Sequence, residues 1–338
     1  MPLTRREFTA AMLGAAGASA LAPAALARLF DDDVFFEWRP VADGAWAILG
    51  AGGNALLIKS RDETLLIDCK NFGLGPTLLE ECLRRTDAIT LALNTHHHGD
   101  HVGGNPTLNA TGVPIVAHAN AEPRLAQTGA QMSALFTAGQ EREAQWADQV
   151  RGQGHTDAGG ERAAALVPEA FAQGRGLGER AFVPSRTVGD ADELRVGDLT
   201  VQLRHIGPGH TDNDVYAVIP QLNLLHTGDL CFHRLHPFID MGAGASSAGW
   251  IESCDAMLAE CDADTTVIPG HGEIGDRSAI RGQREYFSIL RDRMAEARAE
   301  GLSRDEAVAL TIDEFEGYGF ERIKERTFGD VYDEMGAG

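Results

Sequence analysis

One block of six residues, positions 96–101, constrains this chain more than any other feature. It reads His-His-His-Gly-Asp-His and follows directly on a short apolar run at 89–93, which has the character of a buried strand. His96 and His98 lie two positions apart, so their side chains point the same way in an extended segment. The aspartate and the last histidine follow in the turn, where they can face a second metal. A surface histidine tract would tolerate any spacing, whereas this pattern indicates a metal site, with zinc expected and iron or manganese as competitors.

Three later motifs repeat the order of apolar strand, tight turn and ligand-type side chain. They occupy positions 199–212, 224–229 and 267–272. Each motif is weak alone, because a single glycine-histidine turn is more often structural. Together the four motifs place ligand-type residues at strand ends, which is where α/β folds build their sites. The candidate ligands are His96, His98, Asp100, His101, His210, Asp229 and His271.

Short apolar runs alternate with helical stretches, and this alternation predicts an α/β sandwich. Helical periodicity is expected at 78–85 and again, with many charges, at 278–299. Strands are expected at 45–49, 54–59, 64–67, 89–93, 115–117, 180–183, 194–196, 199–203, 215–219 and 224–225.

Two stretches differ from this alternation. Residues 120–175 are rich in Ala, Gln, Glu and Gly, and they predict a helical insertion, with a lid and a dimer arm as alternative roles. Residues 278–338 predict a C-terminal helical segment, in which Ser303 and Glu306 form a capping box for a new helix.

The first 27 residues have the pattern of an export signal. Arg5 and Arg6 precede Phe8, a small apolar run fills 10–22, and small residues at 25 and 27 suit a cleavage site. The paired arginines resemble the twin-arginine class of leader. We therefore expect a signal peptide at 1–27, a domain at 28–338, and a periplasmic or secreted location.

The net charge limits the classes of partner, and the cysteine spacing bears on disulfide bonds. The chain has 29 Lys and Arg against 50 Asp and Glu, a net charge of -21. Such an acidic balance argues against nucleic acid and against anionic lipid, so we expect a small-molecule substrate and no stable membrane insertion after leader cleavage. The five cysteines are irregularly spaced and do not predict a disulfide framework, although pairing of Cys254 with Cys261 stays open.

With its ligand motifs in this order, the chain resembles the metallo-β-lactamase-fold hydrolase superfamily from about Trp46 to Gly272. The resemblance implies a four-layer αβ/βα sandwich with two metal ions at one edge of its sheets. It also implies a second-shell role for Asp68, which would orient a ligand histidine. By position, one metal would take His96, His98 and His210, the other would take Asp100, His101 and His271, and Asp229 would bridge them.

The residue at position 229 separates branches of this superfamily. True β-lactamases of the fold usually carry Cys or Ser there, whereas Asp229 is similar to the glyoxalase II and lactonase branches. The resemblance therefore implies a hydrolase in which a hydroxide bridging two zinc ions attacks an ester, thioester, lactone or related bond. Asp100 would act catalytically as a proton acceptor from the attacking water. A periplasmic class B-like β-lactamase, an iron-dependent oxidoreductase and a non-catalytic metal-binding protein are the alternatives.

The segment 226–240 is long and aromatic for a simple connection, and we expect it to line the mouth of the site. Within it, His233, Arg234 and His236 are candidate substrate-binding residues. The other histidines, among them His118 and His205, favour packing or surface roles.

Overall fold

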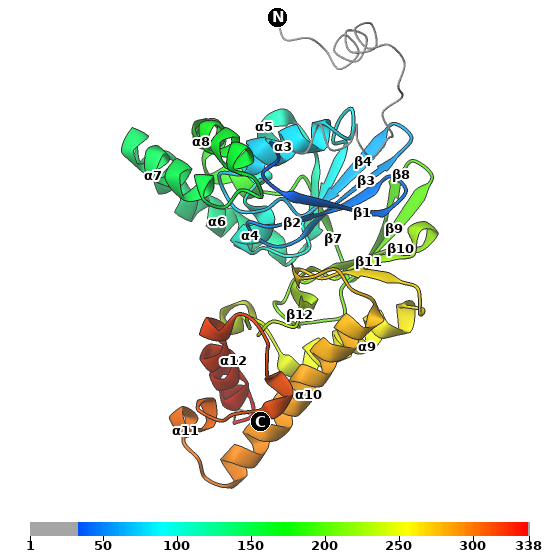
Figure 1. The fold of residues 1–338 in the computed structure, drawn as a ribbon, viewed down its shortest axis with the longest axis vertical. Helices are drawn as coiled ribbons and strands as arrows, with labels where there is room; N and C mark the ends of the chain where they lie inside the picture. Colours follow the sequence, from blue (N-terminus) through cyan, green and yellow to red (C-terminus); the bar gives the residue numbers. More distant parts are fainter. Residues whose placement is uncertain (1–32, 337–338) are drawn as a thin grey trace, which may run out of the picture.

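The computed structural model describes residues 33–336. Two large β-sheets face each other, one of seven strands in the order β1 to β7 and one of five strands in the order β13-β11-β10-β9-β8 (Figure 1). The first sheet consists of β1 (Glu37–Ala42), β2 (Ala45–Leu49), β3 (Ala55–Ser60), β4 (Glu63–Ile67), β5 (Leu91–Leu93), β6 (Ile115–His118) and β7 (Arg186–Val188). The second consists of β8 (Ala191–Val196), β9 (Leu199–Arg204), β10 (Tyr216–Ile219), β11 (Leu224–His226) and β13 (Thr266–Ile268).

Helices cover the outer face of each sheet, which gives the four layers expected from the sequence (Figure 1). The first sheet is covered by α3 (Gly75–Leu83), α5 (Asn105–Thr111), α6 (Ala121–Phe136), α7 (Gln140–Arg151) and α8 (Asp157–Leu177). The second is covered by α9 (Ser247–Glu260) and α10 (Arg277–Ala299), while α12 (Glu321–Glu334) packs on α10 and α11 (Arg304–Val308) packs on α12. The mixed α/β architecture with C-terminal helices is confirmed.

Strand β4 shows how the layers are held together. Successive side chains of a strand point to opposite faces. Accordingly Leu65 and Ile67 pack in the core between the sheets, whereas Leu66 packs under the helices. All three side chains are fully buried, so β4 is apolar on both faces and reads as a continuous hydrophobic run.

Most of the predicted elements form, with one clear exception. The segment 180–183 was expected to be a strand, but it lies in the 3-10 helix η1 (Gly178–Phe182) and the residue that ends it. Gly178 has a φ of 58°, which stops α8, and the tight turn then buries Ala181 and Phe182 against the helical layer. The apolar composition was interpreted correctly as buried, but periodicity over four residues cannot separate a strand from a short helix.

Other local predictions can be compared directly. Ser303 caps α11, and its side chain and that of Glu306 form the expected capping box. The five cysteines are buried and free, so Cys254 and Cys261 do not pair. Within residues 33–336 no helix is both long and apolar enough to cross a bilayer. The predicted leader lies outside the described residues.

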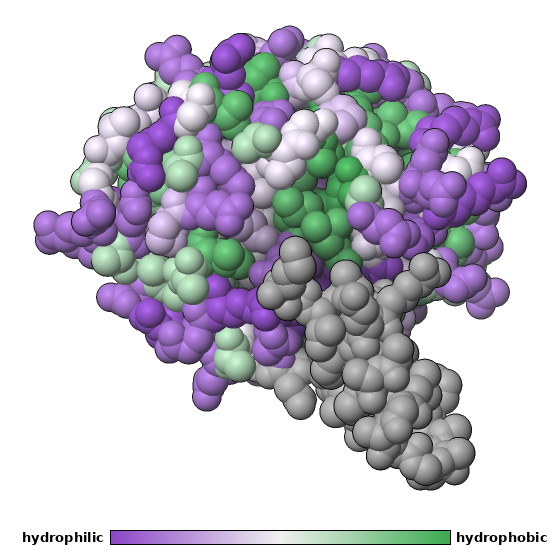
Figure 2. Space-filling model, turned by 90° about the horizontal axis from the view of Figure 1, so that it is seen from above, coloured by the Kyte–Doolittle hydropathy of each residue, from purple (hydrophilic) through white to green (hydrophobic). Residues whose placement is uncertain are grey.

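Helices form in the stretch whose composition predicted them. Three helices, α6 to α8, fill the stretch predicted as an insertion, and together with α3 and α5 they lie over the first sheet. Seen from above, hydrophilic side chains dominate the edge of this face, and apolar ones gather near its centre (Figure 2).

Candidate metal centre

The predicted ligands come from separate segments and meet at one edge of the two sheets. His96 and His98 follow β5, and His210 follows β9. Asp229 lies in the 3-10 helix η3 (Gly228–Leu230), directly after β11. His271 begins the short strand β14 (His271–Gly272), which pairs with β12 (Phe232–His233). Asp100 and His101 lie on the short helix α4 (Gly99–Val102).

One group of side chains surrounds a first position. The ligand atoms of His96, His98, His210 and Asp229 all lie within 4.8 Å of one another. His210 Nε2 is 2.8 Å from His98 Nδ1 and 3.4 Å from Asp229 Oδ2. His96 Nε2 is 3.7 Å from the same carboxylate oxygen. Three imidazole nitrogens therefore converge beside one carboxylate.

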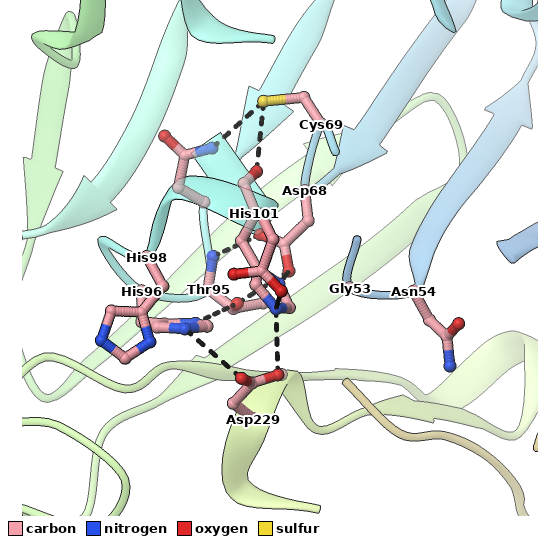
Figure 3. A network of polar contacts seen from close by, with 12 residues as sticks. Gly53, Asn54, Asp68, Cys69, Thr95, His96, His98, His101 and Asp229 are labelled. Carbon is pink, nitrogen blue, oxygen red and sulfur yellow. Dashed lines mark hydrogen bonds and ion pairs between the residues drawn. The ribbon is translucent and has the colours of Figure 1, made fainter. Parts of the chain in front are cut away.

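A second group surrounds a neighbouring position. It contains Asp100, His101 and His271, whose ligand atoms are also within 4.8 Å of one another. His271 Nε2 is 3.2 Å from Asp100 Oδ2 and 3.4 Å from Asp229 Oδ2. His101 Nε2 is 3.0 Å from Asp229 Oδ1. The carboxylate of Asp229 thus lies between the two groups, with one oxygen toward each of two histidines (Figure 3).

Buried atoms without hydrogen-bond partners test whether these residues suit metal ions. His96 Nε2, His101 Nε2 and Asp229 Oδ1 are buried and make no hydrogen bond, although the last two lie close together. Buried polar atoms are rarely left unsatisfied, and each exception calls for an explanation. Here the three atoms point into one space lined by imidazole and carboxylate, which is the donor set of zinc and related cations. These residues are therefore suited to hold metal ions.

The outer nitrogens of the histidines are fixed by further contacts. Asp68 Oδ2 accepts a hydrogen bond from His101 Nδ1 at 2.7 Å, and Asp68 Oδ1 accepts one from the Thr95 backbone N–H at 2.8 Å (Figure 3). His210 Nδ1 donates to the Phe238 carbonyl oxygen at 2.8 Å. The two histidine contacts hold the Nδ1 protons and turn Nε2 toward the site.

The electrostatics also favour cation binding. Burial works against charge on His101, but the carboxylates of Asp229 and Asp100 raise its pKa well above the usual range. Burial also opposes ionisation of Asp229, yet His101 and His271 hold its pKa well below the usual range. Burial lowers the pKa of His210 to about 3. The carboxylates are therefore ionised, and they hold protons on the histidines between them. A metal cation that binds here displaces those protons.

A comparison with protein families decides the assignment. Residues 49–271, more than half of the chain, match the model of the metallo-beta-lactamase superfamily. The chain belongs to the metallo-β-lactamase superfamily. This superfamily is a family of metal-dependent hydrolases.

Individual relatives cover less of the chain. A metallo-beta-lactamase type 2 from Bacillus cereus is 32% identical over 89 residues, which are 26% of this chain and 34% of that protein. The corresponding enzyme of Bacillus sp. (strain 170) is 29% identical over 87 residues, with the same coverage of both. The chain thus spans about a third of the length of these curated relatives.

Solved structures of the superfamily share the fold over most of the chain. A metallo-beta-lactamase from Pontibacter korlensis has a TM-score of 0.52 at 17% identity and covers 75% of this chain and 99% of its own. The DIM-1 metallo-beta-lactamase has a TM-score of 0.52 at 15% identity and covers 75% and 97%.

Two glycines beside the site are required by close approach. A Cβ on Gly53 would lie 2.0 Å from the ring of His101. A Cβ on Gly270 would lie 2.0 Å from Asp229 Oδ1 and 2.6 Å from the Gly228 carbonyl oxygen. Any side chain at these positions displaces a predicted ligand, so both glycines shape the site.

One polar residue of the site was missed by sequence reasoning. Asp240 Oδ2 lies 2.9 Å from His98 Nε2, which leaves His98 Nδ1 to face the site. No local motif marks this aspartate, because it contacts a residue 142 positions away. Its only signal was its position at the end of the long segment 226–240.

The predicted mouth of the site is built from aromatic rings. Phe232 stacks on His271 with ring centroids 4.9 Å apart, and Phe320, which precedes α12, lies 5.7 Å from His271 on another side. Phe238 lies 5.6 Å from the ring of His98. The C-terminal segment therefore contributes to the wall of the site through Phe320.

The three candidate substrate-binding residues differ in their positions. His233 is half-buried, and its Nδ1 lies 2.7 Å from the Glu273 carbonyl oxygen. Arg234 is exposed, with a φ of 57°, and lies over the ring of Tyr318. His236 is only 1% exposed and bonds to Tyr286 in the C-terminal aromatic cluster, so it packs the core and faces no substrate space.

Proposed function

We propose that this chain holds two zinc ions and hydrolyses an ester, thioester, lactone or related bond. The observation that carries the proposal is the position of Asp229 between the two groups of side chains. Its Oδ2 is 3.7 Å from His96 Nε2, and its Oδ1 is 3.0 Å from His101 Nε2. One carboxylate can serve two cations only in such a central position, which supports a binuclear centre.

The ligands would then be divided as the superfamily resemblance implies. His96, His98 and His210 would hold one ion, and Asp100, His101 and His271 the other. When bound, such ions lower the pKa of coordinated water and polarise the oxygen of the scissile group.

Asp100 is suited to proton transfer. Its side chain is 31% exposed, the highest value among the predicted ligands. Burial opposes its ionisation, but His101 and His271 hold the pKa of Asp100 well below the usual range. It is therefore an ionised carboxylate at the open side of the site, able to accept a proton from the attacking water.

The substrate space favours molecules with an apolar part. Phe238 and Phe320 are half-buried rings that lie beside His98 and His271, respectively. Such rings contribute apolar contact area and orient a bound group. Of the three candidate residues for substrate contact, His233 and Arg234 stay in the proposal and the enclosed His236 does not.

Two other functions remain candidates. The curated relatives named above are metallo-beta-lactamases, which favours β-lactam hydrolysis as the second candidate. Asp229 stands against it as the main activity, because the β-lactamase branches of the fold usually carry Cys or Ser there. An iron-dependent oxidoreductase would use the same donor types.

A substrate panel and metal analysis test these choices together. Nitrocefin, a thioester, a long-chain lactone and bis-p-nitrophenyl phosphate are assayed with protein whose metal content has been measured. We expect at least two equivalents of zinc and the fastest turnover on the thioester or the lactone. Turnover dominated by nitrocefin would move the assignment to a β-lactamase, and iron with oxygen consumption would refute the hydrolase.

Export is proposed separately, from the leader pattern at 1–27. The test is a fusion of these residues to a reporter that must fold before transport. We expect export that stops when Arg5 and Arg6 are both replaced by Lys, and export of the double variant would refute the twin-arginine route.

A further inference from the structure

A second group of ligand-type side chains lies outside the centre described above. Ligand atoms of His118, Asp190 and His205 lie within 4.8 Å of one another. His118 Nε2 is 3.8 Å from Asp190 Oδ1, and the rings of His118 and His205 stack with centroids 4.2 Å apart. None of the three belongs to the predicted binuclear centre.

The nitrogen of His205 is prepared for coordination. Its Nδ1 lies 2.8 Å from the backbone carbonyl oxygen of Asp214. A carbonyl only accepts hydrogen bonds, so Nδ1 carries a proton and Nε2 is the ring nitrogen left for a metal. This contact is the same device that fixes His210 through the Phe238 carbonyl in the main centre.

The Nε2 atom of His118 makes no hydrogen bond within the described residues. His118 is 4% exposed, and its Nε2 is buried without a hydrogen bond. Its Nδ1 accepts a long contact, 3.3 Å, from the backbone N–H of Asn120. Coordination through Nε2 requires the proton to move to Nδ1, which ends this contact with Asn120. Because Asn120 is exposed, its N–H can bond to water instead at little cost.

The charge at this position favours a cation. Asp190 supplies an exposed carboxylate, and burial lowers the pKa of His118, so the imidazole is neutral at pH 7. The next carboxylate, Asp212, is paired with the guanidinium of Arg124 and does not compete for the histidines. Two imidazoles and one carboxylate leave a fourth position open to water, which is a common set for zinc.

The three residues also connect the two large sheets. His118 ends β6 of the first sheet, and His205 follows β9 of the second. Asp190 lies in the connection that leads from β7 to β8, from one sheet to the other. We propose that His118, Asp190 and His205 bind one divalent transition metal, zinc in the first instance, which links the two sheets at this edge.

The test compares the zinc content of variants with that of the unaltered chain. Untagged protein is stripped with a chelator, reloaded, and measured by elemental analysis and by competition with a chromophoric chelator. We expect His205→Ala and Asp190→Ala to bind one equivalent less than the unaltered chain, and the exposed His155→Ala to bind the same amount. The proposal fails if both variants keep the full zinc content.

Thermal unfolding gives an independent readout. A metal that binds only the folded state stabilises it by an amount that grows with free metal concentration. We expect zinc to raise the Tm of His118→Ala and His205→Ala less than it raises the Tm of the unaltered chain, because the link between the sheets is lost. Both variants should retain hydrolysis of the preferred substrate. An unchanged zinc dependence of Tm in His205→Ala would overturn the proposal. Because the readouts are differences between variants, they hold even if the chain proves not to be a hydrolase.

Discussion

The contact between Asp240 and His98 gives the most exacting test of the metal centre. Asp240 Oδ2 lies 2.9 Å from His98 Nε2, while His98 Nδ1 faces His210. The hydrogen bond with His98 lowers the pKa of Asp240 to about 2, so the carboxylate is ionised at any working pH. It therefore holds the Nε2 proton of His98 and presents Nδ1 as the ligand atom.

Replacing Asp240 by Asn removes the charge but keeps the size. Losing such an outer contact to a metal ligand typically lowers metal affinity about 10- to 100-fold, which is about 1.4 to 2.7 kcal/mol. We expect a value toward the upper end, because His98 is only 18% exposed and has few other partners for Nε2. The amide can also turn its NH₂ toward the ring and favour the wrong tautomer.

Competition with a chromophoric zinc chelator measures this loss. Asp212→Asn is the matched control, since Asp212 is a similarly exposed carboxylate, 29% against 20%, that pairs with Arg124 and touches no predicted ligand. We expect weaker zinc binding in Asp240→Asn and unchanged binding in the control. If both variants bind zinc within about two-fold of the unaltered chain, the role assigned to Asp240 is wrong.

Three further predictions follow from single positions. Gly270→Ala should lose at least one zinc equivalent and all hydrolysis, because its Cβ would lie 2.0 Å from Asp229 Oδ1; a fully loaded, active variant would contradict the geometry. Burial lowers the pKa of Lys70 from 10.5 to about 7, so the folded state binds fewer protons and gains stability between about pH 7 and 10.5. Lys70→Met, unfolded by urea in chelator, should lack that rise, and equal slopes for both proteins would refute the shift. Phe320→Ala should raise KM about 2- to 10-fold for an aryl ester with little change in kcat, as loss of one aromatic contact predicts; an unchanged KM would exclude this ring from the substrate space.

The sequence was most informative where structure is local. Strand β4 and the capping box at Ser303 were predicted because periodicity and cap residues act over a few positions. The ligand set was visible for the same reason, since every ligand lies in a short motif that follows the end of a strand. The prediction for 180–183 failed because four residues, three of them apolar, are too few to show a period.

Contacts between distant segments were beyond that reasoning. Asp240 meets His98 across 142 positions, and His205 meets His118 from the opposite sheet. The sequence favoured a structural or surface role for His118, and for His205 a packing role or a place behind the ligands, because neither stands at a ligand position of a motif. Only the packing of one sheet on the other shows that the pair shares a space with Asp190.

Strand register explains why separate motifs can form one centre. Strands β4 and β5 are parallel with Ile67 opposite Leu93, so the residues that follow them, Asp68 and Thr95, meet at the same edge. Strands β11 and β13 are parallel with His226 opposite Ile268, and the ligands that follow these strands meet in the same way.

The two edges are joined by Asn54, whose side-chain amide donates to the carbonyl oxygens of Pro269 and Gly272 on the other sheet. The backbone N–H of Asn54 also donates to the Gly270 carbonyl oxygen. This buried contact holds the turn that carries His271 against the first sheet, close to His101. The spacing between the two groups of ligands is therefore set by how the sheets pack, and the bridging position of Asp229 depends on that packing as much as on its own motif.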